Sequence, residues 1–129
     1  YFYNKPNYIL KDRIKLELPD STEVIYYEHS IFDFSYDRVM AKFEISENEI
    51  EYIQNQFENK ENFLQYDPKV QLDQRPPFGG YKWFEIKDET VVYYICTPRT
   101  DKNFNDKGIH KIWAFICKED GKYFLYLSF

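Results

Sequence analysis

The chain has few cysteines, histidines, glycines and methionines, and these shortages exclude several kinds of protein. Its 129 residues include 2 Cys, 2 His, 4 Gly and 1 Met. Cys96 and Cys117 are too few for a disulfide framework, and neither lies in a CxxC or another zinc-binding spacing. His29 and His110 lack the further ligands, at suitable spacing, that a zinc site needs. We therefore expect no metal and no other cofactor.

A basic surplus and a long apolar run are also missing. The sequence has 17 Lys and Arg against 22 Asp and Glu, and its formal net charge is −5. The densest basic group, Lys11, Arg13 and Lys15, is interrupted by Asp12. A nucleic acid or an anionic membrane surface requires a basic face, so we expect no nucleic-acid partner. No run approaches the ~18 apolar residues of a membrane-spanning helix, so no such segment is predicted in this sequence.

Common catalytic motifs are absent as well. The sequence has no nucleophile elbow, Walker loop, dinucleotide fingerprint or HExxH motif. Residues 101–108 (DKNFNDKG) begin like a calcium-binding loop, but Asp106 stands where glycine is required and Ile112 where a bidentate glutamate is required. These absences predict a protein that is not an enzyme. The alternative to this prediction is an enzyme with acid–base carboxylates in a pocket between the helix and the sheet.

The residues that are present are typical of one folded domain. Hydrophobic residues make up 43% of the chain, and 21% of the residues are aromatic. This apolar content excludes a disordered chain, because disorder requires low hydrophobicity and high net charge. A length of 129 residues matches a single domain. We assign residues 1–129 to one α+β domain.

The spacing of apolar residues predicts about six or seven strands and one main helix. The helix is expected over 47–58, because Ser46 and Glu49 can form a capping box and an apolar stripe follows. Residues 60–80 are expected to form a long loop. The predicted fold is a single antiparallel sheet with the helix packed on one face, in the order β-β-β-α-loop-β-β-β-β. The expected strands are 13–18, 23–28, 38–45, 81–87, 90–97, 110–118 and 122–129.

The end of the chain predicts a hairpin of defined register. Asp120-Gly121 favours a two-residue type I′ turn, which places Glu119 opposite Lys122. The strand 110–118 carries apolar residues on both faces. A strand of this kind must be covered on both sides, so we expect the helix on one side and, on the other, the N-terminal lead-in, the segment 60–80 or a partner.

The same reasoning bears on the two thiols. If the strands 90–97 and 110–118 form a simple hairpin, Thr97 lies near His110 and Cys117 lies near Thr90. Cys96 is then about 20 Å from Cys117 at ~3.3 Å per residue, whereas a disulfide requires Cα atoms within ~7 Å. We therefore expect two unpaired, buried thiols.

The most distinctive stretch is 75–83 (RPPFGGYKW), which combines a proline pair, two glycines and three aromatic residues. Such a loop can present rigid aromatic side chains to a protein or a sugar. The candidate binding residues are therefore Arg75, Phe78, Tyr81 and Trp83. In the alternative interpretation, Phe78 packs in the core, Trp83 enters the sheet, and the loop has only a structural role.

Three further segments are 18–24 (LPDSTEV), 38–43 (RVMAKF) with 46–50 (SENEI), and 120–125 (DGKYFL). Together they resemble small bacterial exported or lipoprotein-type domains of uncharacterised function. The resemblance implies placement in the cell envelope and transfers no catalytic residue. The first residue is Tyr1 rather than Met, which is compatible with a signal segment or a lipid anchor upstream.

Two functional hypotheses follow. The first is a non-enzymatic, extracytoplasmic binding or protein-interaction domain, compatible with the soluble part of a bacterial lipoprotein. Its partner is expected to be another protein or a component of the cell envelope. The alternative is a small, acidic, cytoplasmic immunity or inhibitor protein that binds a toxin or an enzyme, because an acidic surface suits a basic partner.

Overall fold

The computed structural model describes residues 6–33, 36–59, 82–98 and 111–129. Within these ranges the chain forms two α-helices, five strands and three single turns of 3-10 helix. In chain order the elements are α1 (Pro6–Ile14), β1 (Glu23–Asp33), β2 (Tyr36–Ile45), η2 (Glu47–Glu49), α2 (Ile50–Glu58), η3 (Lys82–Phe84), η4 (Asp88–Thr90), β3 (Val91–Pro98), β4 (Lys111–Glu119) and β5 (Lys122–Ser128).

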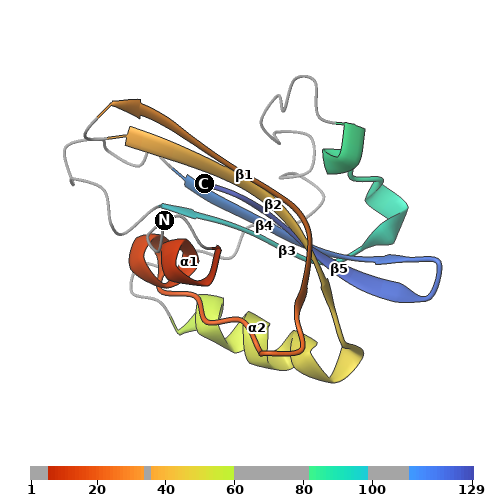
Figure 1. The fold of residues 1–129 in the computed structure, drawn as a ribbon. Helices are drawn as coiled ribbons and strands as arrows, with labels where there is room; N and C mark the ends of the chain where they lie inside the picture. The colour runs from red at the N-terminus through yellow and green to blue at the C-terminus, as the bar shows by residue number, and fades with distance from the viewer. Residues whose placement is uncertain (1–5, 34–35, 60–81, 99–110) are drawn as a thin grey trace.

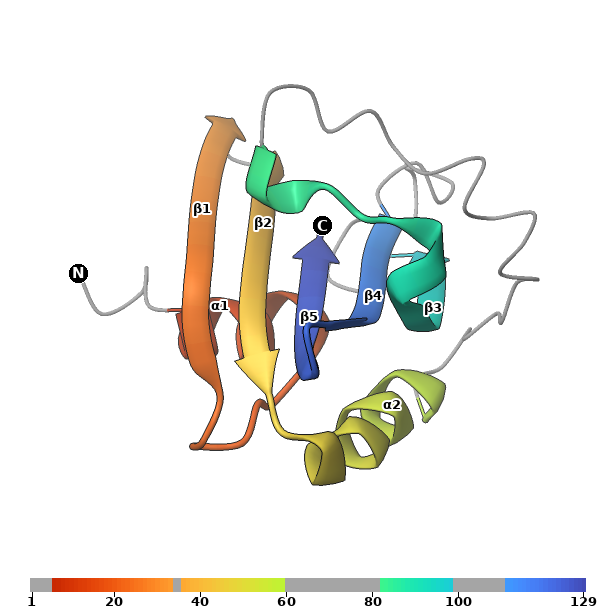
Figure 2. The same cartoon turned by 90° about the vertical axis from the view of Figure 1, so that its right-hand side faces the viewer.

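The five strands form one antiparallel sheet in the order β1-β2-β5-β4-β3. The last strand of the chain, β5, therefore lies at the centre of the sheet, between β2 and β4 (Figure 2). The α+β class and the single antiparallel sheet are confirmed. The predicted count of six or seven strands is wrong for the described part of the chain, which has five. The predicted strand 23–28 is also longer than expected, since β1 continues to Asp33.

The prediction of a strand over 13–18 is wrong. Residues up to Ile14 belong to the helix α1, and Lys15 then adopts a left-handed backbone with φ 55°. The N–H groups of Lys15 and Leu16 donate to the carbonyls of Lys11 and Leu10, each at 3.2 Å, and so close the end of the helix. Ile14 and Leu16 are both buried, as expected, but a helix end and the segment after it place them inward. The alternation of polar and apolar residues over 13–18 therefore reflects burial on one side and not pairing with a neighbouring strand.

The prediction of a strand over 81–87 is also wrong. Lys82–Phe84 and Asp88–Thr90 are single 3-10 turns, and the segment between them crosses the face of the sheet without joining it (Figure 2). Phe84 and Ile86 are buried, while Glu85 and Lys87 are exposed. An extended segment lying flat on a sheet buries every second residue, just as a half-buried strand does.

The predicted helix is confirmed, with a first turn of 3-10 helix at Glu47–Glu49 before α2. The capping box is present, and the N–H of Ser46 donates to a Glu49 carboxylate oxygen at 3.2 Å. The Ser21 hydroxyl donates to the other oxygen at 2.8 Å. Burial acts to raise the pKa of Glu49, but the hydrogen bonds from Ser21 and Ser46 outweigh it and lower that pKa. The cap therefore also ties α2 to the segment before β1.

Two hydrophobic layers cover the two faces of the sheet. Helices α1 and α2 lie on one side, and the segment 82–90 lies on the other (Figures 1 and 2). This arrangement confirms that β4 is covered on both faces. The N-terminal lead-in forms α1 and covers the first face together with α2, so two helices, rather than one main helix, lie there. The lead-in is therefore not the cover of the second face, which is the segment 82–90 within the described residues. The helical residues of the first layer are Ile9, Leu10, Ile14, Ile53 and Phe57. The second layer includes Met40, Phe84, Ile86, Tyr94, Phe115 and Tyr126.

The hairpin of β4 and β5 has the predicted turn and register. Asp120 and Gly121 both have positive φ, 52° and 80°, as a type I′ turn requires. Glu119 faces Lys122, and Cys117 faces Phe124. Because only two residues set the turn and the register follows from it, this part of the sheet could be derived locally.

The hairpin of β3 and β4 has a different register from the predicted one. Cys117 faces Val91 instead of Thr90, so the register is offset by one residue from the start. A bulge between Val91 and Tyr93 adds a second residue, so Thr97 faces Ile112 instead of His110. Cys96 and Cys117 are both buried, and they form no disulfide, as predicted. The inserted residue shifts the strand without bringing the two thiols together.

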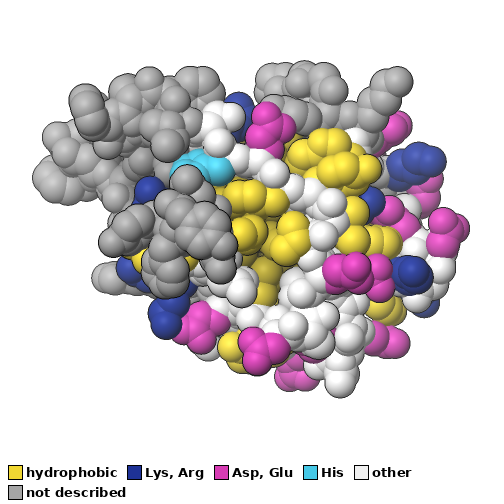
Figure 3. All heavy atoms as spheres, in the orientation of Figure 1, with side chains coloured by type: hydrophobic (Ala, Val, Ile, Leu, Met, Phe, Trp, Pro, Cys, Tyr) yellow, Lys and Arg dark blue, Asp and Glu magenta, His cyan; other side chains and the backbone are white. Residues whose placement is uncertain are grey.

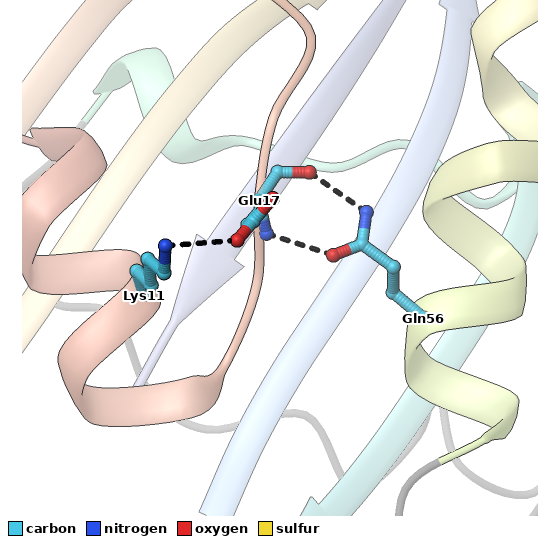
Figure 4. Close-up of polar contacts among 3 residues, drawn as sticks. All are labelled: Lys11, Glu17 and Gln56. Carbon is cyan, nitrogen blue, oxygen red and sulfur yellow. Dashed lines mark hydrogen bonds and ion pairs between the residues drawn. The ribbon is translucent and has the colours of Figure 1, made fainter.

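A side-chain clamp joins α2 to the segment between α1 and β1 (Figure 4). The Gln56 amide nitrogen donates to the carbonyl of Glu17 at 2.7 Å, and the N–H of Glu17 donates to the Gln56 side-chain oxygen at 2.7 Å. The Glu17 carboxylate also lies 3.1 Å from the Lys11 ammonium group. Gln56 thus bonds the peptide backbone as a neighbouring strand would.

We expect Gln56→Ala to lower the free energy of unfolding by about 1–2 kcal/mol, because two backbone hydrogen bonds are lost. Asn55→Ala, at the exposed neighbouring position of the same helix, is the control and should change stability by less than about 0.5 kcal/mol. Urea denaturation followed by circular dichroism measures both values. Equal effects of the two substitutions would contradict the clamp.

Candidate functional site

Of the four predicted binding residues, one is described. Arg75, Phe78 and Tyr81 lie outside the described residues. Trp83 is half-buried in η3 and is not part of the sheet, so its expected entry into a strand is wrong. Its ring stacks on Tyr26 of β1, with centroids 4.9 Å apart and planes inclined by 17°. The Tyr26–Trp83 pair, called the aromatic platform below, is the feature on which the candidate site is built.

The aromatic platform reaches the surface through Tyr26. This side chain is 47% exposed, and the two residues before it, Val24 and Ile25, are exposed as well. The strand β1 forms one edge of the sheet, and in the described part of the chain only β2 pairs with it. Figure 3 shows hydrophobic side chains at the surface of the molecule, with Asp and Glu side chains beside them. Apolar surface of this kind at a sheet edge is typical of a contact site.

The buried side of the aromatic platform is anchored in the outer hydrophobic layer. Trp83 meets Phe84 edge-on at 5.6 Å, and Phe84 meets Tyr126 edge-on at 5.4 Å. Phe84 and Tyr126 are buried. The exposed Tyr26 ring is therefore backed by a chain of aromatic contacts that leads into the core, and its position is fixed before any partner binds.

Next to this chain lies a polar cluster of Lys42, Glu119 and Tyr126. The Lys42 ammonium group lies 3.5 Å from the Glu119 carboxylate and over the rings of Phe124 and Tyr126, at 4.5 and 5.1 Å. The Tyr126 hydroxyl donates a hydrogen bond to Glu119. Burial, followed by the hydrogen bond and the negative charge of Glu119, raises the pKa of Tyr126 well above its ordinary value. The cluster connects the strands β2, β4 and β5, and the charge of Lys42 is balanced by the carboxylate of Glu119.

The raised pKa values of two tyrosines predict a loss of stability in alkaline solution. Burial and the nearby charge of Glu58 also raise the pKa of Tyr93. An unfolded tyrosine loses its proton near pH ~10, while these folded tyrosines keep theirs. Above that pH the unfolded state binds fewer protons than the folded state, so the free energy of unfolding should fall as pH rises.

Urea denaturation at several pH values between about 9 and 11 measures this effect. The double variant Tyr93→Phe/Tyr126→Phe should show a shallower decline than the wild type, because the two proton-linked groups are gone. Tyr52→Phe, at an exposed position of α2, is the control and should decline like the wild type. A double variant with the wild-type slope would contradict the assignment.

The described residues offer no group of three or more His, Cys, Asp or Glu side chains that could hold a metal ion. His29 lies half-buried on β1, and His110 lies outside the described residues. Among the helices that the structure describes, none is long and apolar enough to cross a membrane.

The sequence did not single out Tyr26, the exposed half of the aromatic platform. The run from Val24 to Tyr27 carries four apolar or aromatic residues in a row, which breaks the expected alternation of a half-buried strand. This break in the alternation is the feature of the sequence that could have pointed to Tyr26. Its explanation, a register shift between Val24 and Tyr26, is visible only in the pairing of β1 with β2.

Comparisons of this chain with protein-family models, with curated proteins and with solved structures found no match.

Proposed function

We propose that this chain is a non-enzymatic protein-interaction domain whose binding surface is the aromatic platform and the exposed start of β1. The observation that carries the proposal is the half-exposed Tyr26 ring stacked on Trp83 at 4.9 Å. Rigid aromatic residues that are backed by a packed core are the usual centres of protein interfaces. The partner is another protein or a component of the cell envelope.

The proposed setting is extracytoplasmic, with the domain as the soluble part of a bacterial lipoprotein. This part of the proposal rests on the resemblance of residues 18–24, 38–50 and 120–125 to exported domains. The alternative is a cytoplasmic immunity or inhibitor protein, which the net charge of −5 favours. Fractionation of the producing cells distinguishes the two settings: recovery with the membrane or the cell exterior supports the first, and recovery in the cytoplasm supports the second.

Site-specific photo-crosslinking tests the binding surface. The photoreactive residue p-benzoylphenylalanine replaces Tyr26 in one variant and Tyr52 in the other, and both variants are made in the producing cells. Tyr52 is a suitable control because it is 48% exposed, close to the 47% of Tyr26, but lies on α2. We expect a discrete covalent adduct from position 26 and none from position 52. Equal adducts from both positions, or none from position 26, would contradict the proposal.

The adduct also leads to a quantitative test. The crosslinked partner is identified by mass spectrometry, purified, and titrated against the wild-type chain. We expect Tyr26→Ala to weaken binding by about 2 kcal/mol, the typical cost at the centre of an interface. Tyr52→Ala should bind like the wild type. Urea denaturation of both variants checks that the effect on binding is not caused by unfolding.

A further inference from the structure

We infer that the aromatic platform accepts a positively charged side chain, an arginine, from a basic protein partner. This inference rests on the proposed function and names the chemistry that the same surface recognises. It is carried by the placement of carboxylates around Tyr26, by the absence of an ion pair between these carboxylates and the described residues, and by the geometry of the two rings.

Two carboxylates of β1 lie on the same face as Tyr26: Glu28 by the ordinary alternation of a strand, and Glu23 because of the bulge. In the pairing with β2, Glu23 is opposite Glu44, Tyr26 is opposite Lys42, and Glu28 is opposite Met40. The partners 44, 42 and 40 alternate along β2 and so share one face of the sheet. Glu23, Tyr26 and Glu28 therefore share that face too, although Glu23 and Tyr26 are three residues apart. The extra residue in the bulge is Ile25.

The carboxylates around Tyr26 are not neutralised by the described part of the chain. Glu23 and Glu28 are exposed, and neither they nor Glu44 form an ion pair with a described residue. Glu23 stands directly opposite Glu44, and like charges at opposite positions of neighbouring strands repel each other. A cation bound at this place would relieve that repulsion.

The basic side chain directly opposite Tyr26, Lys42, already has an ion-pair partner. Lys42, opposite Tyr26, is 15% exposed; it lies 3.5 Å from the carboxylate of Glu119 and 4.5 Å from the centroid of the Phe124 ring. It is held over the central strands and away from the edge carboxylates. Lys42 is therefore not available to Glu23 and Glu28, and the net charge of −5 attracts a basic partner.

Arginine fits this surface better than lysine does. A guanidinium group stacks flat on an aromatic ring and at the same time offers paired N–H donors to a carboxylate, whereas an ammonium group is a compact point charge. The exposed Tyr26 ring supplies the stacking surface, and Glu23 and Glu28 supply the acceptors. An uncharged sugar would stack on the rings but would leave both carboxylates unbalanced.

A titration followed by NMR tests the inference on the full chain. The probe is a blocked pentapeptide with arginine at its second and fourth positions and glycine and valine elsewhere. The chain has 2 Trp residues, so its spectrum has two indole N–H peaks, which Trp113→Phe assigns. We expect saturable movement of the Trp83 peak and little movement of the Trp113 peak. The same peptide with citrulline in place of arginine keeps the shape without the charge, and it should bind about tenfold more weakly.

Matched charge variants separate the local carboxylates from the overall charge. Glu23→Gln/Glu28→Gln and Glu47→Gln/Glu51→Gln each remove two negative charges, the first beside Tyr26 and the second at exposed positions at the start of the α2 region. We expect the first pair to weaken peptide binding about tenfold and the second to leave it unchanged within about twofold. Equal effects of the two pairs would overturn the inference.

Other outcomes also overturn the inference, and they leave the proposed function to its own test. Equal affinity for the arginine and citrulline peptides removes the need for a cation. A Trp83 peak that does not move up to a peptide concentration of about 1 mM excludes arginine recognition. Movement of the Trp83 peak with cellohexaose but not with the peptide would show that the aromatic platform recognises a sugar and not a cation. The crosslinking from position 26 does not depend on any of these results, so the two proposals can fail separately.

Discussion

Replacing Phe57 by alanine is expected to lower the free energy of unfolding by about 3–5 kcal/mol, the largest effect of any substitution considered for this chain. The Phe57 side chain is fully buried, and it belongs to the layer that packs α2 against the sheet. Alanine removes the apolar contacts and leaves a cavity that its neighbours, Ile53 and the residues of the sheet, fill only in part. Urea denaturation followed by circular dichroism measures the loss.

Tyr52→Ala is the matched control for Phe57→Ala. It removes an aromatic ring from the same helix, but Tyr52 is exposed, so stability should change by less than about 0.5 kcal/mol. Phe57→Leu refills most of the space and should cost less than the alanine substitution. A loss below about 1 kcal/mol in Phe57→Ala would show that α2 does not dock on the sheet as described.

Glu119→Ala should lower the free energy of unfolding by about 2–4 kcal/mol. Glu119 serves two partly buried groups at once: its carboxylate lies 3.5 Å from the Lys42 ammonium group and accepts a hydrogen bond from the Tyr126 hydroxyl. Without it, a lysine that is 15% exposed loses its ion-pair partner, and a buried hydroxyl loses its acceptor. Both costs arise because little water reaches these groups.

An exposed ion pair provides the comparison for Glu119→Ala. Lys11 and Glu17 lie 3.1 Å apart, closer than Lys42 and Glu119, but their side chains are 70% and 57% exposed. Glu17→Ala should therefore cost less than about 1 kcal/mol in spite of the shorter distance. Glu119→Gln keeps an acceptor for Tyr126 and should fall between the wild type and Glu119→Ala. If Glu17→Ala cost as much as Glu119→Ala, burial would not explain the effect.

Part of the fold could be predicted because a few neighbouring residues determine it. Asp120 and Gly121 define the turn of the last hairpin, and the register from Glu119 to Cys117 follows without further information. Ser46 and Glu49 define the start of the α2 region in the same way. In each case the conformation depends on backbone angles or hydrogen bonds between residues that are close in the chain.

The candidate site could be predicted only in part. The stretch 75–83 was identified as a binding candidate on its composition, and its described member, Trp83, does belong to an aromatic surface. The sequence could not indicate that this ring stacks on Tyr26. Tyr26 lies far away in the chain, and a bulge at Ile25 determines which residues of β1 share its face. No short-range pattern encodes a contact between two distant segments.

By itself, the sequence determined the buried face of several segments, where the helical region 47–58 begins, how the last hairpin turns, and that the two thiols form no disulfide. Only the tertiary structure decided which buried segments pair as strands. The alternating residues of 13–18 and 82–87 bury one side, as expected, yet neither segment joins the sheet. Alternation reflects burial on one side, which a helix end or a chain lying across a sheet also produces. Strand pairing requires a partner backbone, and the packing of the whole chain supplies it.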